Sequence, residues 1–238
     1  MPDSALRFEQ VSKTFGTTVA LQSLTLTVRR GEFFALAGVN GAGKTTLIKC
    51  LLDFCEPDAG AIEIFGVPHR QTKARQPLGF LPEQFVPPYY LTGRDFLRLF
   101  LALNQRDYDP SQTATMLQRL DFNPPDIAKP ARLLSKGMTQ KLGLAACLLA
   151  AKSLYVLDEP MSGLDPKARA MLKAVLFQLK QQGATVFFTS HALADIEELC
   201  DRMAILHAGQ AKFCGTPAEL RQQCGGASLE EGFLRCIQ

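Results

Sequence analysis

The chain has 238 residues, of which 47% are hydrophobic and 21% are charged, and its formal net charge at pH 7 is +3. This composition is typical of a globular protein with a sizeable core and excludes a disordered or fibrous chain. The length fits one domain, or one domain with an inserted lobe. Lysine and arginine are scattered and form no basic block, so we expect no nucleic acid partner.

The seven cysteines form an odd set without a C-x-x-C pair. Neither a complete disulfide framework nor a zinc ribbon is expected, and a reducing cytosol is the simpler compartment. The first residues, MPDS, do not lead from a basic region into an apolar stretch, so we expect no cleaved signal. The longest apolar stretch covers residues 142–151, whereas a helix that spans a bilayer needs ~20 residues. Any membrane role is therefore expected to be exerted from outside the bilayer.

The first part of the chain is rich in strand patterns. Short apolar or alternating segments at residues 5–11, 19–28, 33–38 and 61–65 are separated by turn residues and predict strands. An apolar run over residues 47–52 predicts a helix directly after the third strand.

The middle of the chain has a helical pattern. Thr92 and Asp95 have the spacing of a capping box, and apolar residues follow at helical intervals, so a helix is predicted to begin there. Prolines at positions 124, 125 and 130 interrupt the pattern. Because nearly all of residues 86–150 look helical while strands dominate before them, we expect an inserted helical lobe.

Strands and helices alternate after this lobe. An apolar strand is predicted over residues 154–157, and Asp165 with Pro166 supplies the N-cap and first turn of a helix that ends at Gly183. Further strands are predicted over residues 184–189 and 203–206. This alternation indicates a mainly parallel sheet covered by helices. After Pro217 the sequence indicates one short helix and a glycine-rich tail.

A phosphate-binding loop is predicted between the third strand and its helix. Residues 38–45, GVNGAGKT, match G-x-x-x-x-G-K-[ST] in the strand–helix context that this motif requires. The curled backbone directs N–H groups at phosphate oxygens, and the helix dipole favours an anion. We expect Lys44 to reach the β- and γ-phosphates, Thr45 to bind Mg²⁺ and Thr46 to donate to the α-phosphate. The whole predicted cradle is Gly38, Val39, Asn40, Gly41, Ala42, Gly43, Lys44, Thr45 and Thr46.

Two adjacent carboxylates end the strand over residues 154–157. Burying such charges is costly unless they meet a cation. Asp158 is placed to hold Mg²⁺ through its water shell, and Glu159 to orient or deprotonate an attacking water. Alone, the segment is equally compatible with a solvated acidic turn, but the phosphate loop favours the catalytic interpretation. The chain lacks an N-K-x-D guanine-reading motif, so ATP is preferred over GTP.

Residues 134–140, LSKGMTQ, are similar to the L-S-G-G-Q signature of nucleotide-binding subunits of ATP-binding cassette (ABC) transporters. The chain resembles this family from Phe8 to about Leu220. The resemblance implies an α/β fold of the P-loop NTPase (RecA-like) type, with a mainly parallel sheet core, an antiparallel β subdomain and an inserted α-helical subdomain. It also implies one nucleotide-binding domain over residues 1–238, with its core at 1–85 and 151–216, its helical subdomain at 86–150 and a C-terminal tail at 217–238.

The signature departs from the family pattern at two positions. Lys136 and Met138 replace its first glycine and its glutamine, whereas Ser135 and Gly137, which contact phosphate in the family, are present. The S-K-G-M form is similar to that of bacterial exporter ATPases. From the residues themselves, Ser135 is expected to cap the helix that follows, which gives a second anion site at its exposed N-terminus. In isolation the segment would be an ordinary capped helix.

Four further roles come from the resemblance. Phe15 matches the aromatic residue that stacks on adenine, although a packed phenylalanine at a strand end is the alternative. His191 matches the switch histidine at the γ-phosphate. Asp165 matches a loop that crosses the dimer interface, besides its helix-capping role. Glu83 falls where the family has a glutamine that reaches Mg²⁺, a role that a carboxylate can also fill; the alternative is Gln84.

The resemblance implies an ATPase that is peripheral to the cytoplasmic face of the inner (cell) membrane. Two chains, either copies or similar cassettes, would close around two ATP·Mg²⁺ and drive a separate transmembrane permease subunit, with export favoured. An aromatic cluster at residues 85–91 is expected either to line the permease groove or to form a buried hinge. The alternatives are a soluble ABC ATPase that drives cytosolic assembly, such as iron–sulfur cluster scaffolding, and a P-loop kinase.

Overall fold

The computed structural model describes residues 4–237 and contains two β-sheets. The larger sheet has six strands in the order β10-β9-β3-β8-β7-β6, and all its neighbours are parallel except the edge pair β10 and β9. Its strands are β3 (Phe33–Ala37), β6 (Leu78–Leu81), β7 (Leu154–Leu157), β8 (Thr185–Ser190), β9 (Arg202–His207) and β10 (Gln210–Gly215). The predicted mainly parallel sheet is therefore confirmed, and β6 and β10 are additional to the predicted strands.

The second sheet is antiparallel and has the order β2-β1-β4-β5. Its strands are β1 (Ser4–Phe15), β2 (Thr18–Arg29), β4 (Ala59–Ile64) and β5 (Val67–Pro68). The α/β fold with an antiparallel β part is thereby confirmed.

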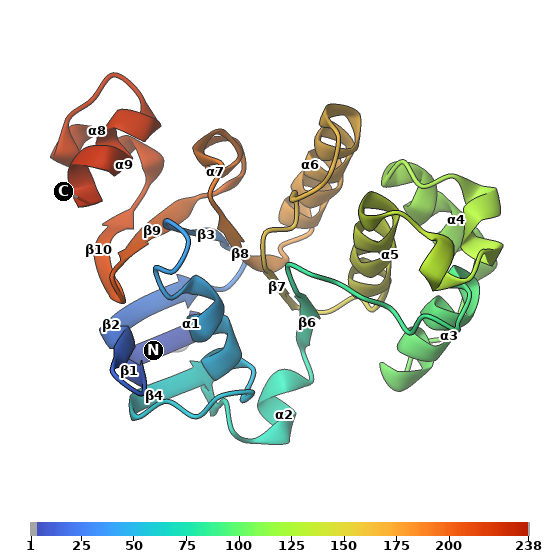
Figure 1. Ribbon diagram of the computed structural model, residues 1–238, viewed down its shortest axis with the longest axis horizontal. Helices are drawn as coiled ribbons and strands as arrows, with labels where there is room; N and C mark the ends of the chain where they lie inside the picture. Colours follow the sequence, from blue (N-terminus) through green and yellow to red (C-terminus); the bar gives the residue numbers. More distant parts are fainter. Residues whose placement is uncertain (1–3, 238) are drawn as a thin grey trace.

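Helices cover both faces of the larger sheet. Helices α6 and α7 lie on one face, α1 and the antiparallel sheet lie on the other, and α3, α4 and α5 gather beyond β6 and β7 (Figure 1). Within residues 4–237, none of these helices has the length and apolar character needed to cross a membrane. The helical segments are α1 (Lys44–Leu51), α2 (Thr72–Arg75), α3 (Gly93–Leu103), α4 (Pro110–Arg119), η1 (Pro124–Ala128), η2 (Ala131–Leu133), α5 (Lys136–Leu149), α6 (Pro166–Gln181), α7 (Leu193–Leu199), α8 (Pro217–Cys224) and α9 (Leu229–Ile237).

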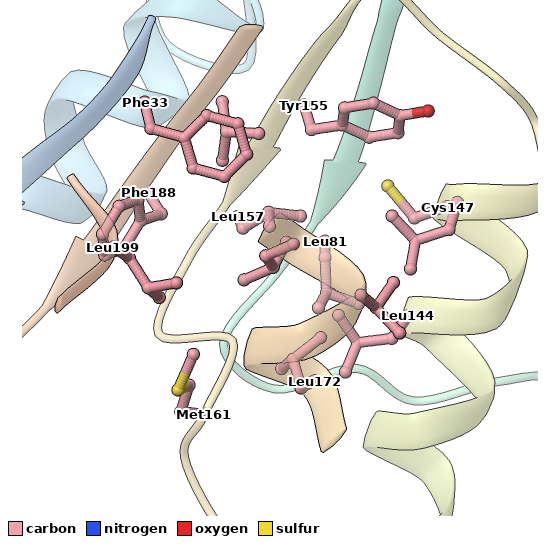
Figure 2. Close-up of a cluster of buried hydrophobic side chains, with 14 of the residues drawn as sticks. Phe33, Leu81, Leu144, Cys147, Tyr155, Leu157, Met161, Leu172, Phe188 and Leu199 are labelled. Atoms are coloured by element: carbon pink, nitrogen blue, oxygen red, sulfur yellow. The ribbon is translucent and has the colours of Figure 1, made fainter. Parts of the chain in front are cut away.

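The central strands are apolar throughout because both of their faces are buried. Alternate side chains of β3 enter different cores: Phe33 packs on the side of α6 and α7, whereas Phe34 packs on the side of α1. Figure 2 shows the first of these cores, in which Phe33, Leu157 and Phe188 from the sheet lie near Leu172 of α6 and Leu199 of α7. Since β3, β7 and β8 are parallel, the residues that follow them meet at one edge of the sheet.

The predicted helix starts at Thr92 and Asp165 are confirmed by their hydrogen bonds. Thr92 Oγ1 accepts a hydrogen bond from the Asp95 amide at 3.1 Å, and Asp165 Oδ1 accepts one from the Ala168 amide at 3.0 Å. Each cap satisfies an amide that has no partner within its helix.

The prediction of one short helix followed by a glycine-rich tail is wrong. Residues 225–228, which include Gly225 and Gly226, form an irregular connection, and a second helix, α9, follows. Ser228 Oγ accepts a hydrogen bond from the Glu231 amide at 3.2 Å, and Leu229 is fully buried. The helix is stable because its apolar side packs on α8 and the core, which short-range pattern does not reveal.

Gly143 of α5 provides a test of the packing between this helix and the segment after β6. A methyl group at its Cα would lie 2.7 Å from the Phe85 ring and 2.8 Å from Leu81 Cδ1. A glycine-to-alanine change within a helix normally stabilises it by about 1 kcal/mol, whereas overpacking costs about 1–3 kcal/mol. We therefore predict that Gly143→Ala lowers the free energy of unfolding in urea.

Gly232→Ala in α9 is the matched control, because the nearest atom to its new methyl group would be Leu220 Cγ at 3.4 Å. This variant should be as stable as the parent or more stable. A Gly143→Ala protein that is as stable as the parent, or more stable, would show that the contact between Gly143 and the Phe85 ring leaves room for a methyl group.

Candidate functional site

A cavity of about 430 Å³ lies at the sheet edge where β3, β7 and β8 end. The sequence-predicted residues that it brings together come from the loop after β3, the carboxylates after β7 and the histidine after β8. The cavity is lined by Thr18, Val19, Ala20, Asn40, Gly41, Ala42, Gly43, Lys44, Thr45, Thr46, Glu83, Asp158, Glu159 and His191.

The loop before α1 is folded as a cradle for an anion. Gly43 has a φ of +111°, and a Cβ there would lie 2.4 Å from the Ala20 carbonyl oxygen, so only glycine fits. No side chain caps α1, and its first turn has no acidic residue, which leaves its amides available to a ligand. The buried Lys44 donates from Nζ to the carbonyl oxygens of Gly38 at 2.6 Å and Val39 at 3.3 Å. Its ammonium group is thus held at the loop.

An oxygen-rich position lies between α1 and the end of β7. The Thr45 hydroxyl lies 3.4 Å from Asp158 Oδ2, and the Thr189 hydroxyl donates to Asp158 Oδ1 at 2.6 Å. Hydroxyl and carboxylate oxygens suit Mg²⁺, which is commonly held by one or two protein groups together with phosphate oxygens and water. The donor set therefore fits this ion, with Thr189 orienting the carboxylate.

Glu159 and His191 form a bonded pair at the cavity. Glu159 Oε2 lies 2.9 Å from His191 Nδ1, and the Glu159 amide donates to Thr189 Oγ1 at 2.8 Å. The backbone φ of Glu159 is +49°, a left-handed conformation that is costly for a residue other than glycine. This buried carboxylate is consequently held in one orientation by its backbone, by Thr189 and by the imidazole.

Two of the predicted residues lie at the margins of the cavity. Glu83, which follows β6, lines it, whereas the exposed Gln84 does not. Phe15 is half-exposed at the turn between β1 and β2, where it pairs with the cavity residue Thr18. Lys13 Nζ lies 5.4 Å from the centre of the Phe15 ring.

Among the other predicted residues, Gly38 and Val39 do not line the cavity, and three more lie apart from it and form a second surface. Ser135 Oγ accepts a hydrogen bond from the Met138 amide at 3.2 Å and so caps α5. A Cβ on Gly137 would lie 3.3 Å from the Gly163 carbonyl oxygen, so the tip of α5 abuts the loop that ends at Asp165. The Ala168 amide holds the pKa of the Asp165 carboxyl below its ordinary value, so this group stays ionised. We call this surface, residues 135–137 and 162–165, the helix-tip surface.

Sequence reasoning missed the contribution of β2 and of Thr189. Thr18, Val19 and Ala20 line the cavity because the start of β2 lies against the phosphate loop, where Gly43 approaches the Ala20 carbonyl oxygen. The position of Thr189, just before Ser190 and His191, is a signal that could have indicated its contact with the carboxylates.

Comparisons with known proteins agree on one family. The model of the ABC transporter family matches residues 21–162. An uncharacterized ABC transporter ATP-binding protein of Nostoc sp. is 40% identical over 205 residues, which make up 85% of this chain and 61% of the relative. The chain thus spans about three fifths of that protein's length. A Nod factor export ATP-binding protein I of Burkholderia lata is 37% identical over 97% of this chain and 77% of its own.

The solved structure of an ATP-binding subunit of an ABC transporter has the same architecture. Its TM-score is 0.89 at 32% identity, and the match covers 98% of this chain and 99% of that chain. The similarity to this subunit, in both fold and sequence, therefore extends over nearly the whole chain.

The position of the Lys44 ammonium group at the loop predicts that this residue contributes to the affinity for ATP. Lys44→Met removes the ammonium group from the cradle, and a charge-assisted hydrogen bond contributes about 1.5–3 kcal/mol, so the Kd for Mg·ATP should rise about tenfold or more. Titration of a fluorescent ATP analogue measures this change. Lys49→Met, an exposed lysine on the same helix, is the control and should bind like the parent. Equal affinities for the parent and Lys44→Met would place the triphosphate elsewhere.

Proposed function

The chain belongs to the ABC transporter family, and on this premise we propose that it is the ATP-binding and ATP-hydrolysing subunit of a transporter. The observation that carries the proposal is the single cavity shared by Lys44, Thr45, Asp158, Glu159 and His191. A phosphate cradle, oxygen ligands for Mg²⁺ and an oriented carboxylate are the groups that phosphoryl transfer to water requires.

The cradle residues bind and orient the triphosphate. Lys44 exchanges its bonds to the loop carbonyls for phosphate oxygens, and the amides of α1 donate to the same group. Thr45 and Asp158 would hold Mg²⁺, with Glu83 as a further oxygen donor from the margin. When bound, this ion neutralises charge that develops on the transferred phosphoryl group.

Glu159 and His191 act on the water. The Glu159 carboxylate accepts the proton of the attacking water, and its strained backbone and its contact with His191 restrict it to one direction. With Nδ1 donating to Glu159, the other imidazole nitrogen is left available to the γ-phosphate of a nucleotide bound in the cavity that His191 lines.

The separation of the helix-tip surface from the cavity supports a two-chain site. Ser135, Gly137 and Asp165 do not line the cavity of their own chain. In a head-to-tail pair, the α5 tip of each copy would close the cavity of the other and supply a second set of amides to the γ-phosphate. Two chains, or this chain and a similar cassette, would thus enclose two ATP molecules and reopen after hydrolysis.

An exposed apolar segment between β6 and α3 supports a separate permease as the partner. Phe85 and Leu91 pack against the core, whereas Val86, Tyr89 and Tyr90 are 82%, 67% and 68% exposed. Exposed aromatic and apolar residues that cluster in this way mark docking surfaces. The occupant that we propose is a cytosolic helix of a transmembrane subunit, so that the chain would act at the cytoplasmic face of the cell membrane. The resemblance to a Nod factor export protein favours export.

Glu159→Gln tests the catalytic part of the proposal. The amide retains the shape of the side chain but accepts no proton, and loss of a general base lowers turnover by about 10²–10⁴-fold. Binding of ATP should persist, and light scattering during size-exclusion chromatography should show a dimer in Mg·ATP. Parent-like turnover in this variant would show that another group is the base.

The helix-tip surface is tested in the same background. Adding Ser135→Arg to Glu159→Gln should abolish the ATP-dependent dimer, because a bulky cation blocks the α5 tip, while nucleotide binding by the monomer stays intact. A dimer of unchanged stability would contradict the shared site.

The membrane partner is tested by fractionating cells that make the chain at its natural level. We expect the parent to sediment with membranes and to cross-link to an integral membrane protein. Val86→Glu with Tyr90→Glu should move it to the soluble fraction without loss of ATPase activity, whereas Leu234→Glu, an exposed apolar residue on α9, should have no effect. A parent chain that stays soluble and captures no membrane protein would instead favour the cytosolic assembly ATPase.

A further inference from the structure

A buried carboxylate connects the two helices that follow the catalytic loops. Asp195 lies in the first turn of α7, four positions after His191, and its side chain is 7% exposed. Asp195 Oδ1 lies 2.8 Å from Nζ of Lys173 on α6. Oδ2 lies 3.6 Å from a terminal nitrogen of Arg169, which is beyond hydrogen-bond distance. Lys173 is therefore the principal partner.

The two helices begin at different functional segments. Helix α6 follows the loop that ends at Asp165, and the Arg169 amide donates to the Asp165 carbonyl oxygen at 2.9 Å. Helix α7 follows directly after β8 and His191. The Lys173–Asp195 pair thus joins the helix of the helix-tip surface to the helix of the cavity histidine.

Apolar contacts and a charged contact hold these two helices in different ways. Leu172 of α6 and Leu199 of α7 point into the core that covers the sheet (Figure 2). Such burial holds both helices against the sheet but is non-directional. The Lys173–Asp195 ion pair, at 2.8 Å between Nζ and Oδ1, keeps one point of α6 in contact with one point of α7, although a buried ion pair by itself contributes little net stability. Burial acts to lower the pKa of Lys173, but the Asp195 and Glu198 carboxylates outweigh it and hold that pKa above its ordinary value.

We propose that the Lys173–Asp195 ion pair is a positioning contact for His191: it fixes the orientation of α7 against α6 and so holds the imidazole in register with Glu159 and with the loop that ends at Asp165. The inference rests on the proposed role of His191 in ATP hydrolysis. Asp195 is not among the residues that line the cavity, whereas His191 is, so its effect would be exerted through the histidine.

Kinetics of two matched variants test the proposal. Asp195→Asn removes the charge with little change of shape, and Glu198→Gln removes the more exposed carboxylate that Lys173 also contacts on the same helix. We expect Asp195→Asn to lower kcat about tenfold, which corresponds to about 1.4 kcal/mol, with the KM for ATP changed less than about twofold. Glu198→Gln should retain the parent kcat and KM, and Lys173→Arg should retain most of the parent kcat.

The NMR signals of the histidine rings provide a second test. They would stay unchanged if the Lys173–Asp195 pair only stabilised the fold. The chain has three histidines, so NMR spectra of histidine-labelled protein contain three imidazole sets, which His191→Gln assigns. Asp195→Asn should shift the His191 signals and leave those of His69 and His207 in place, and Glu198→Gln should shift none. If Asp195→Asn does not fold, Lys173→Met removes the other half of the pair and is measured in the same way.

Unchanged His191 signals in Asp195→Asn, or an unchanged kcat, would overturn the proposal. An equal loss of kcat in Glu198→Gln would also overturn the proposal, because it would show that kcat responds to any loss of negative charge near Lys173. A parent chain without ATPase activity would defeat the proposed function, whereas the His191 signals would still decide whether Asp195 positions the imidazole.

Discussion

The confinement of Lys44, Asp158 and Glu159 to one buried cavity is the constraint on which the rest of the structure depends. Three ionisable side chains at a sheet edge are costly unless each has a partner. In the described chain these partners are the loop carbonyls for Lys44, the Thr189 hydroxyl for Asp158 and the His191 ring for Glu159. All of them come from segments that meet because β3, β7 and β8 are parallel neighbours in the sheet.

This arrangement leaves the helix-tip surface apart from the cavity, as the proposed two-chain site requires. The cavity groups follow the sheet strands, whereas Ser135 begins α5, which packs among α3, α4 and β6. Phe85 fits against Gly143 of α5 and so ties the segment after Glu83 to the same helix. This contact links α5 to the segment beside Glu83 at the margin of the cavity, which suits the proposed closure of two chains around ATP.

Helices α6 and α7 are held by two kinds of contact, apolar packing and an ion pair. Their apolar sides fill the core beneath them, and the Lys173–Asp195 pair lies between their polar sides. The apolar contacts stabilise the layer, while the ion pair is the contact that we propose to orient α7 near His191.

Much of the cavity was predictable from the sequence because its signals are local. The phosphate loop is defined by glycines, a lysine and a threonine within eight positions between a strand and a helix. The starts of two helices are indicated by the capping residues Thr92 and Asp165, whose signals lie within one helical turn. Tertiary structure alone decided that Glu83 and not Gln84 lines the cavity, that Thr18 joins it, that α9 is a helix and that Asp195 meets Lys173. These features depend on contacts between residues far apart in the chain, whose pairing is set by packing in three dimensions and leaves no short-range pattern.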